Sequence, residues 1–356
     1  MTRIAHFGPA RVIVGVDTHK DEHVAVAIDH LGGLLGEYRL RTTTSGYGDL
    51  DRWARGLGEV VAFGVEGTGS YGAGLSRFLA RRDHVVIEVN RPDRSVRRRL
   101  GKSDSIDAES AARSVLAGTA TGTPKSGTGN VEMIRALSIA RSSAVKACTQ
   151  ASNQIHSLVT TAPAELQGVL DGLSTGKLVK RCSNLRPGKL TTVVSTAKFV
   201  LRSIARRHQY LAAEISTLDV VLKRLTEETA PELTGAYCIG PNTAAALLIT
   251  AGDNPERMKS EAAFAALCSV SPVPASSGKT NRHRLNHGGD RRANAALHQI
   301  VIVRLRHDAR TRAYMERRTK EGKGKMEIIR CLKRIVAREV FKILRNLDQQ
   351  SLKKAA

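Results

Sequence analysis

The sequence is poor in aromatic residues and contains no paired cysteine motif. Aromatic side chains make up 4% of the 356 residues, and Trp53 is the single tryptophan. Aliphatic side chains must therefore supply most of the packing, and a platform that binds single strands mainly by base stacking is disfavoured. The five cysteines are scattered, with no Cys-x-x-Cys pair and no histidine at zinc-finger spacing. This spacing predicts reduced core thiols and argues against zinc.

Long apolar runs are also missing, whereas positive charge is in large excess. No run of about 18 apolar residues and no secretory signal is present, so we expect no membrane association and a bacterial cytoplasmic location. The formal net charge is +23, from 56 Lys and Arg against 33 Asp and Glu. Residues 279–356 hold 22 basic and 7 acidic side chains, a net charge of +15. Such an excess favours a polyanionic partner, first of all nucleic acid.

Short β-rich runs and helical stretches alternate in the first part of the chain. Strands are expected at residues 11–16, 23–29, 36–44, 60–66 and 84–89. Helices are expected around Trp53, at residues 71–82 and from about Ser103 onwards. Three hairpin-connected strands followed by alternating helices and strands predict an α/β, ribonuclease-H-like domain with a mixed sheet.

Changes in composition divide the chain into four parts. We expect the ribonuclease-H-like domain at 1–120, a Gly-, Thr- and Pro-rich linker at 121–130, a helical coiled-coil region at 131–229 and a basic, mainly α-helical domain at 230–356. The coiled-coil prediction rests on a heptad seam, Leu201, Ile204, His208, Leu211, Ile215, Leu218, Leu222 and Leu225. This seam fits packing within the chain and self-association about equally well. No fold is predicted for residues 159–190.

Four acidic residues stand at the ends of predicted elements. Asp17 and Glu66 close near-continuous apolar strands, and Asp104 and Asp107 begin a helix with i, i+3 spacing. If they converge, their repulsion requires a cation, and carboxylate oxygens suit Mg²⁺. Two such ions can hold the attacking and leaving oxygens of a phosphoryl transfer. The alternative for Asp104 and Asp107 is an ordinary pair of acids favoured by the helix dipole.

Basic side chains near the second acidic pair and in the C-terminal region predict contacts to phosphates. The predicted residues are Arg94, Arg97, Arg98, Arg99, Lys102, Lys279, Arg282, Arg284, Arg291, Arg292, Lys323 and Lys325. Gly240 lies in a stretch, 237–249, that fits both a helix-hairpin-helix presenting amides to a phosphate and a plain packing unit. The run "GTGSYG" at 67–72 matches a dinucleotide-binding pattern, but no acid follows at the expected distance. We expect its glycines to form a tight turn beside Glu66.

Several segments together resemble the DEDD-type transposases of bacterial insertion sequences, the IS110 family. They are "VGVDTHKDEHVAVAID", "GVEGTGSYGAGLSRFL", "VNRPDRSVRRRLGKSDSIDAESAA", "LTGAYCIGPNTAAALLITAGD", "FAALCSVSPVPASSGKT" and "NHGGDRRANAALHQI". The resemblance implies a RuvC-like domain with Asp17, Glu66, Asp104 and Asp107 as its metal-binding acidic quartet. It also implies a C-terminal domain with Ser277 as nucleophile. From the residues alone, Ser276 is an equal rival. The chain departs from the family at Asn294, where many members carry arginine.

The activity implied by this resemblance is RNA-guided DNA recombination. Family members form a covalent 5′-phosphoserine link to DNA and exchange strands between donor and target, each chosen by a structured guide (bridge) RNA encoded in the element. Because exchange requires two duplexes held together, we expect a homo-oligomer, a dimer or a tetramer. Two alternatives stay open: a RuvC-type metal-dependent junction nuclease that acts by hydrolysis, and a non-catalytic nucleic-acid-binding protein.

Overall fold

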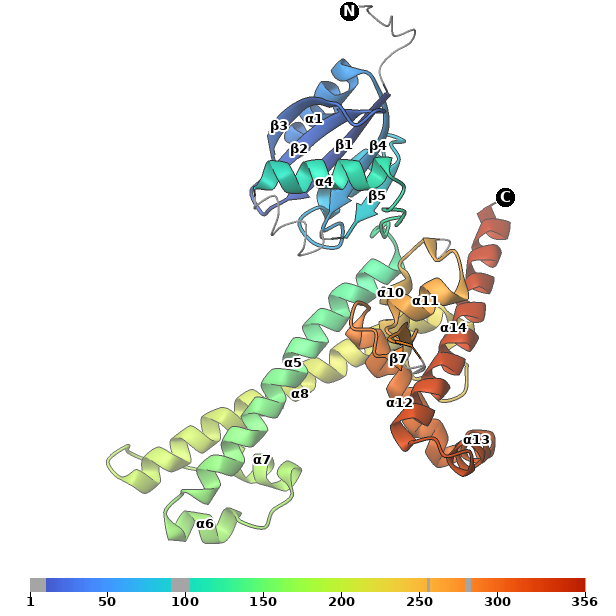
Figure 1. The fold of residues 1–356 in the computed structure, drawn as a ribbon. Helices are drawn as coiled ribbons and strands as arrows, with labels where there is room; N and C mark the ends of the chain where they lie inside the picture. The colour runs from blue at the N-terminus through green and yellow to red at the C-terminus, as the bar shows by residue number, and fades with distance from the viewer. Residues whose placement is uncertain (1–10, 91–102, 255–256, 279–282, 356) are drawn as a thin grey trace, which may run out of the picture. The chain divides into compact units, whose positions relative to one another are not determined.

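The computed structural model describes residues 11–90, 103–254, 257–278 and 283–355 (Figure 1). The chain folds into two compact units, residues 1–129 with 251–259 and residues 130–250 with 260–356. Each unit has its own hydrophobic core. Among the helices in the described ranges, none is long and apolar enough to cross a lipid bilayer.

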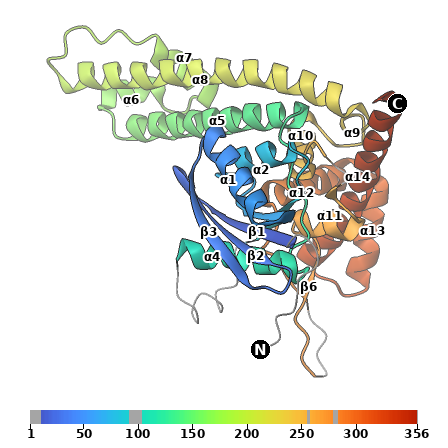
Figure 2. The same cartoon turned by 90° about the horizontal axis from the view of Figure 1, so that it is seen from above.

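A five-stranded mixed sheet forms the centre of the first unit. Its strands are β1 (Arg11–Thr18), β2 (Glu22–Asp29), β3 (Leu34–Arg41), β4 (Glu59–Glu66) and β5 (Val86–Val89). Their order is β3-β2-β1-β4-β5, with β1 to β3 antiparallel and β4 and β5 parallel to β1. Helices α1 (Thr44–Leu57) and α2 (Ala73–Ala80) cover one face, and α4 (Asp104–Leu116) covers the other (Figures 1 and 2). The predicted mixed sheet is confirmed, and the arrangement is consistent with a ribonuclease-H-like domain.

Alternation of side chains along β1 divides the core between the two faces of the sheet. Val14 and Val16 belong to the cluster formed with α1 and α2, whereas Ile13 packs with α4. Because residues two apart on a strand share a face, Gly15 and Asp17 lie on the α4 side with Ile13. The end of β1 therefore presents a carboxylate to the helix that carries the second acidic pair.

Two glycines allow α4 to lie close to the sheet. Gly15 of β1 and Gly64 of β4 are directly paired. A Cβ on Gly15 would overlap the carbonyl oxygen of Ala108 and the amide nitrogen of Ala112, and a Cβ on Gly64 would lie 2.7 Å from Val115 Cγ2. Since the obstacle at Gly15 is helix backbone, a larger residue would require α4 to move away.

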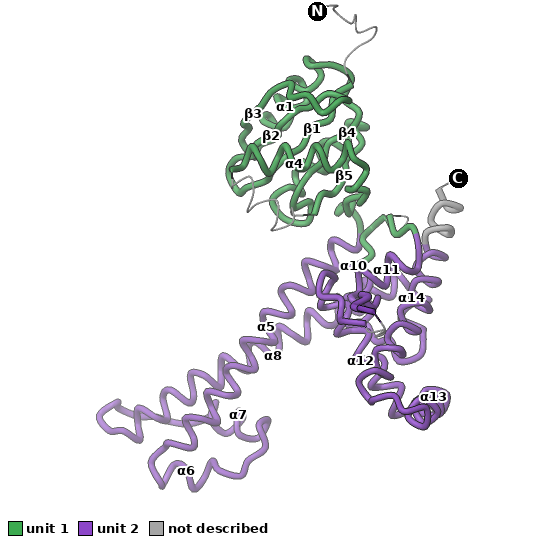
Figure 3. The backbone as a smooth tube through the Cα atoms, in the orientation of Figure 1, with its two compact units in different colours: residues 1–129, 251–259 green, residues 130–250, 260–356 purple. Residues whose placement is uncertain are grey.

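Two long helices and two short ones form one part of the second unit (purple in Figure 3). They are α5 (Asn130–Thr160), α6 (Ala164–Leu170), α7 (Thr175–Ser183) and α8 (Val193–Thr229). Arg141 of α5 pairs with Asp219 of α8, and Gln154 of α5 accepts a hydrogen bond from Arg207. The contact nearer the start of α5 is made with the later residue of α8, and the contact farther along α5 with the earlier one, so the two helices are antiparallel. Helices α6 and α7 pack on them around a core that includes Ile155, which gives residues 159–190 a helical fold.

The predicted heptad seam of α8 is buried unevenly. Leu201, Leu222 and Leu225 are buried within the chain, whereas Leu211 and Ile215 in the middle are partly exposed. Packing within the chain therefore accounts for both ends of the seam. The coiled-coil geometry and self-association through the seam stay predictions.

The remainder of the second unit is mostly helical, as predicted for the C-terminal region. It contains α9 (Pro231–Thr234), α10 (Pro241–Ala251), α11 (Glu261–Leu267), α12 (Arg291–His307), α13 (Ala309–Lys320) and α14 (Lys325–Ala355). A two-stranded hairpin of β6 (Val273–Pro274) and β7 (His283–Arg284) lies between α11 and α12. The carboxylates of Asp290 and Asp308 accept hydrogen bonds from backbone amides at the starts of α12 and α13. Aspartate N-caps of this kind explain why these helices begin where they do.

Replacement Gly15→Val is expected to destabilise the first unit by at least about 2 kcal/mol, because overpacking of a filled core typically costs about 1–3 kcal/mol. Chemical unfolding followed by circular dichroism measures the change. Gly56→Ala is the control, since a Cβ on Gly56 meets nothing within 4 Å. This helical, exposed position should instead gain about 0.5–1 kcal/mol. Wild-type stability of Gly15→Val would contradict the close contact between α4 and the sheet.

Candidate functional site

The ends of β1 and β4 bring two acidic side chains to the same edge of the sheet. Val16 is paired with Val65, so Asp17 and Glu66 occupy the next position on neighbouring parallel strands. Glu66 shares the face of Gly64, which is the α4 side. Asp17 is 7% exposed and Glu66 6%, and acids are rarely so deeply buried without a partner.

Helix α4 adds the second pair of acids to this edge. The Ser103 hydroxyl caps the helix by accepting a hydrogen bond of 3.2 Å from the amide of Ile106. Asp104 and Asp107 lie in the first turn, and Asp107 is buried. Burial is the main cause that raises the pKa of Asp17, and the charges of Asp107 and Asp104 add to it. The structure therefore places all four predicted acids at one edge of the first unit.

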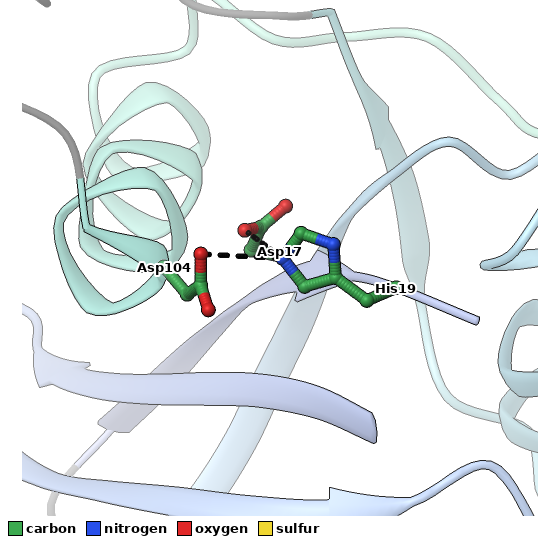
Figure 4. Close-up of side chains that lie close together, drawn as sticks. All are labelled: Asp17, His19 and Asp104. Carbon is green, nitrogen blue, oxygen red and sulfur yellow. Dashed lines mark ion pairs between the residues drawn. The ribbon is translucent and has the colours of Figure 1, made fainter. Parts of the chain in front are cut away.

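His19 lies between two of these acids (Figure 4). Its Nε2 is 3.1 Å from Asp17 Oδ2 and 3.2 Å from Asp104 Oδ1. One donor atom from each of the three residues lies within 4.8 Å of the other two, a spacing suited to a metal ion. The sequence-based prediction did not include His19. The available signal was its position two residues after Asp17, because such residues share a side of an extended chain.

The donor atoms fit a divalent metal ion. Carboxylate oxygens suit Mg²⁺ and Mn²⁺, whereas an imidazole nitrogen favours transition metals over Mg²⁺. A cation would also offset the repulsion that raises the pKa of Asp17, an effect that His19 already opposes. A divalent-metal site is therefore consistent with these residues, and the side chains do not select Mg²⁺ by themselves.

The turn after β4 holds Glu66 in place. The Thr18 hydroxyl donates to the carbonyl oxygen of Glu66 at 3.0 Å, which ties the ends of β1 and β4 together. Gly67 has φ +60°, and its carbonyl oxygen accepts from the amide of Ser70. A Cβ on Gly72 would lie 2.6 Å from the Glu66 carbonyl oxygen. The tight glycine turn predicted beside Glu66 is confirmed.

A segment from late in the sequence, residues 251–259, belongs to the first unit and is called the returning segment here. Its Arg257 pairs with Glu88 of β5 at 3.2 Å and donates to the carbonyl oxygen of Thr123 at 2.9 Å. The other carboxylate oxygen of Glu88 accepts from the Thr68 hydroxyl at 2.7 Å, in the turn after Glu66. The Arg257 side chain is 8% exposed, so water screens this ion pair only weakly. Glu88 thus connects the acidic site to the returning segment.

Asn254 fixes the same segment to the predicted linker. Its Nδ2 donates to the carbonyl oxygen of Pro124 at 2.9 Å, and its Oδ1 accepts from the amide of Ser126 at 3.0 Å. The amide of Glu88 donates to the carbonyl oxygen of Gly122 at 2.7 Å. The stretch before α5 therefore makes defined contacts within the first unit.

The predicted nucleophile lies in the second unit, in the β6–β7 hairpin. Ser277 and its neighbour Ser276 are both exposed. Gly278 follows with φ +53°, a backbone conformation that glycine adopts readily. The four acids share one edge of the first unit, whereas Ser277 belongs to a different unit.

Seven of the predicted phosphate contacts lie outside the described residues: Arg94, Arg97, Arg98, Arg99, Lys102, Lys279 and Arg282. Arg284, Arg291 and Arg292 are exposed, on β7 and at the start of α12. Lys325 is exposed at the start of α14. Lys323 donates to Glu327 at 2.6 Å, which raises the pKa of its ammonium and occupies part of its hydrogen-bonding capacity.

Gly240 precedes α10, and its carbonyl oxygen accepts from the amide of Ala244 at 2.9 Å. The positive φ in this turn belongs to Cys238, at 64°. Residues 237–249 thus form a turn and most of a helix, preceded by the short α9. The helix-hairpin-helix and its phosphate contact stay predictions.

Asn294, the position that departs from the family pattern, has a structural role. Its Nδ2 donates to the carbonyl oxygens of Cys268 and Ser269, which follow α11, and its Oδ1 accepts from Lys333 Nζ at 2.9 Å. The amide therefore joins α12 to the end of α11 and orients a lysine of α14. An arginine, which cannot accept a hydrogen bond, could not make the same set of contacts.

Comparison with protein-family models matches both parts of the chain. Residues 14–162 match the model of DEDD-type IS110 transposases, and residues 231–316 match the model described as "Transposase IS116/IS110/IS902 family". The first match contains Asp17, Glu66, Asp104 and Asp107, and the second contains Ser277. None of the curated proteins matches the chain.

Replacement Asp17→Asn is expected to raise the melting temperature of the metal-free protein at neutral pH by a few degrees. Folding raises the pKa of Asp17 above 3.8, so the negative charge of Asp17 lowers the stability of the folded protein. This loss of stability is absent below pH 3.8, and it grows as pH rises through the folded-state pKa. Mn²⁺ or Mg²⁺ should stabilise the wild type and not the variant. Calorimetry with and without metal tests this, with Asp49→Asn, at a carboxylate paired with Arg52 in α1, as control. Equal metal-induced shifts in wild type and Asp17→Asn would argue against the metal site.

Replacement Arg257→Ala is expected to release the returning segment from the first unit. Hydrogen exchange should accelerate in residues 251–254 and 257–259 and in the turn around Thr68, because Glu88 loses its charged partner. A double-mutant cycle with Glu88→Gln should give a coupling energy of about 1–3 kcal/mol. Arg52→Ala, at a position 79% exposed, is the matched control and should leave both segments unchanged. Unaltered exchange in Arg257→Ala would show that the ion pair does not hold the segment.

Proposed function

Because the chain belongs to the IS110 family of transposases, we propose that it recombines DNA through a covalent serine–DNA intermediate, at sites that a guide RNA selects. The family implies cutting and rejoining of DNA in transposition. The observation that carries the finer proposal is the meeting of Asp17, Glu66, Asp104 and Asp107 at one edge of the sheet. Convergence of four carboxylates is costly without a cation, and a bound divalent ion would in turn attract a phosphate.

In the proposed reaction, the hydroxyl of Ser277 attacks a phosphorus atom of the DNA backbone. A new bond forms between Ser277 Oγ and phosphorus, the bond to the 3′ oxygen breaks, and the hydroxyl proton leaves as the 3′ oxygen gains one. The 3′-hydroxyl of another strand then reverses these steps and releases the serine. One phosphoester bond replaces another at each stage, so rejoining requires no ATP.

The acidic quartet would hold the metal ion, with His19 as an additional nitrogen donor. When bound, a divalent ion neutralises phosphate charge and stabilises the oxygen that leaves. Burial of Asp17 and Glu66 fixes their side chains and limits the competition from water. The turn around Gly67 and the cap of α4 by Ser103 hold the quartet in one arrangement.

The proposed partners are donor DNA, target DNA and a structured guide RNA, in the bacterial cytoplasm. The net charge of +15 in residues 279–356 supports binding dominated by the phosphate backbone and weakened steeply by salt. Acids and serine stand on separate units, an arrangement in which the quartet of one copy can assist the serine of another. A dimer or tetramer is therefore part of the proposal.

Replacement Ser277→Ala is expected to abolish covalent protein–DNA adducts and to lower strand exchange by several orders of magnitude, as for other nucleophiles. Ser276→Ala is the matched control and should keep both activities. Asp104→Asn should lose both without removing the serine. Denaturing gels with labelled DNA and guide RNA measure the adducts. Adducts in Ser277→Ala would refute the assignment, and wild-type cleavage without adducts would favour a hydrolytic nuclease.

A further inference from the structure

The second unit contains a cavity of about 860 Å³ beside the β6–β7 hairpin. It is a half-open cavity lined by the loop after α11, by β7 and the loop that follows it, and by residues of α12, α13 and α14. Its volume falls in the range of about 300–1,000 Å³ that is typical of sites for small ligands or single groups of a larger one. The roles proposed for the acidic site and for Ser277 do not involve this cavity.

Five Arg and Lys side chains line the cavity, and one of them, Arg334, has an acidic partner. The other four are Arg284, Arg291, Arg330 and Lys333. Among the described residues, no carboxylate lies within 4.0 Å of any of their charged nitrogens. By contrast, Arg334, the fifth basic residue of the lining, is paired with Glu261. Four cations that have no acidic partner and share one cavity repel each other, which favours an anionic occupant.

The single acid in the cavity wall does not offset this charge. Glu327 is already paired with Lys323 at 2.6 Å, so that pair is neutral as a whole. The other polar groups in the wall, which include His287 and His298, are neutral or positive. The cavity therefore carries a net positive charge under all ordinary conditions.

Lys333 is held in the wall rather than free in solvent. Its Nζ donates to Asn294 Oδ1 at 2.9 Å, and Asn294 is itself fixed by two carbonyl oxygens. Burial, followed by the charge of Arg330, lowers the pKa of the Lys333 ammonium. The remaining two N–H groups of Lys333 are left for an incoming acceptor.

Apolar side chains complete the wall. Val270, Leu285, Met326 and Ile329 line it together with the ring of Tyr314. A phosphate ion would fill only a small part of the space and would leave these side chains uncovered. An occupant with an anionic end and a flat, largely apolar body matches both halves of the wall, and a nucleotide has this chemistry.

The position of the hairpin relates the cavity to Ser277. Pro274 and His283 are paired at the base of the hairpin, and His283 lines the cavity. Ser277 lies three residues beyond Pro274, which places it at most about 11 Å farther along the chain. An occupant of the cavity is thus close to the proposed nucleophile.

We propose that this cavity binds one unpaired nucleotide of the strand that Ser277 attacks. Arg284, Arg330 and Lys333 bind its phosphate, and the base lies against Leu285 and Ile329. The nucleotide is unpaired because a base that is stacked and paired inside a regular duplex cannot reach the apolar wall of a concave site. Its position next to the scissile phosphate rests on the proposed function, whereas the capture of a nucleotide does not.

The test measures binding of a labelled single-stranded oligonucleotide and of the matching duplex to the full-length protein at fixed salt. Arg330→Gln and Lys333→Met should weaken single-strand binding at least about tenfold, the usual scale for a lost charge-assisted hydrogen bond. Leu285→Trp, which fills the cavity without changing its charge, should do the same. Duplex binding should change much less. Lys342→Met, an exposed lysine on α14 outside the cavity, is the matched control and should have little effect on either.

Two outcomes would overturn the proposal. If Lys342→Met weakens single-strand binding as much as Lys333→Met, the lysines act through the overall positive charge of the protein and not through a site in the cavity. If Leu285→Trp binds single strands as tightly as the wild type, no base enters the cavity. Ser277→Ala, assayed beside them, should bind normally. Adducts that persist in Ser277→Ala would disprove the serine assignment and leave the binding comparison unaffected.

Discussion

The close approach of α4 to the sheet at Gly15 and Gly64 is the contact on which the candidate site depends. The acids come from two strands and one helix, so the distance between helix and sheet sets the distance between carboxylates. The short distance between α4 and the sheet is possible because the paired residues Gly15 and Gly64 have no side chains. The alanines of α4 fill the contact and are fully buried. Repulsion between the carboxylates opposes this packing of α4 on the sheet, because Asp104 and Asp107 of α4 both raise the pKa of Asp17 on β1.

Because of this repulsion, each acid-bearing element has to be held in place by local contacts. The cap of Ser103, the hydrogen bond from Thr18 to Glu66, and the turn at Gly67 each hold one acid-bearing element. His19 reduces the repulsion by placing a nitrogen between Asp17 and Asp104, and a divalent ion would reduce it further. On the proposed metal binding, the repulsion between the acids would lower the stability of the metal-free protein and would be relieved when the ion binds.

Local patterns were sufficient to predict the mixed sheet and the position of its acids. Alternation fixes which face Asp17 occupies, and an i, i+3 spacing puts Asp104 and Asp107 on one side of a helix, so both features can be read from a few residues. Contacts that depend on how closely two helices or strands approach each other could not be predicted from such short patterns. The bridge made by His19 requires the helix to lie close, which only the paired glycines permit. Similarly, the heptad seam of α8 predicts an apolar stripe but not the neighbour that covers it, and residues 159–190 carry too short a pattern to predict α6 and α7.

The returning segment is the feature that sequence patterns were least able to predict, and it changes how the chain divides. Residues 251–259 lie within the second family match, yet Arg257 and Asn254 bind Glu88 and the stretch before α5 in the first unit. The unit that holds the acids is therefore completed by residues from the region that holds the serine. Glu88 contacts both this segment and the turn beside Glu66, and the segment continues through α11 to the hairpin of Ser277. The first unit therefore contains residues from two regions that are far apart in the sequence.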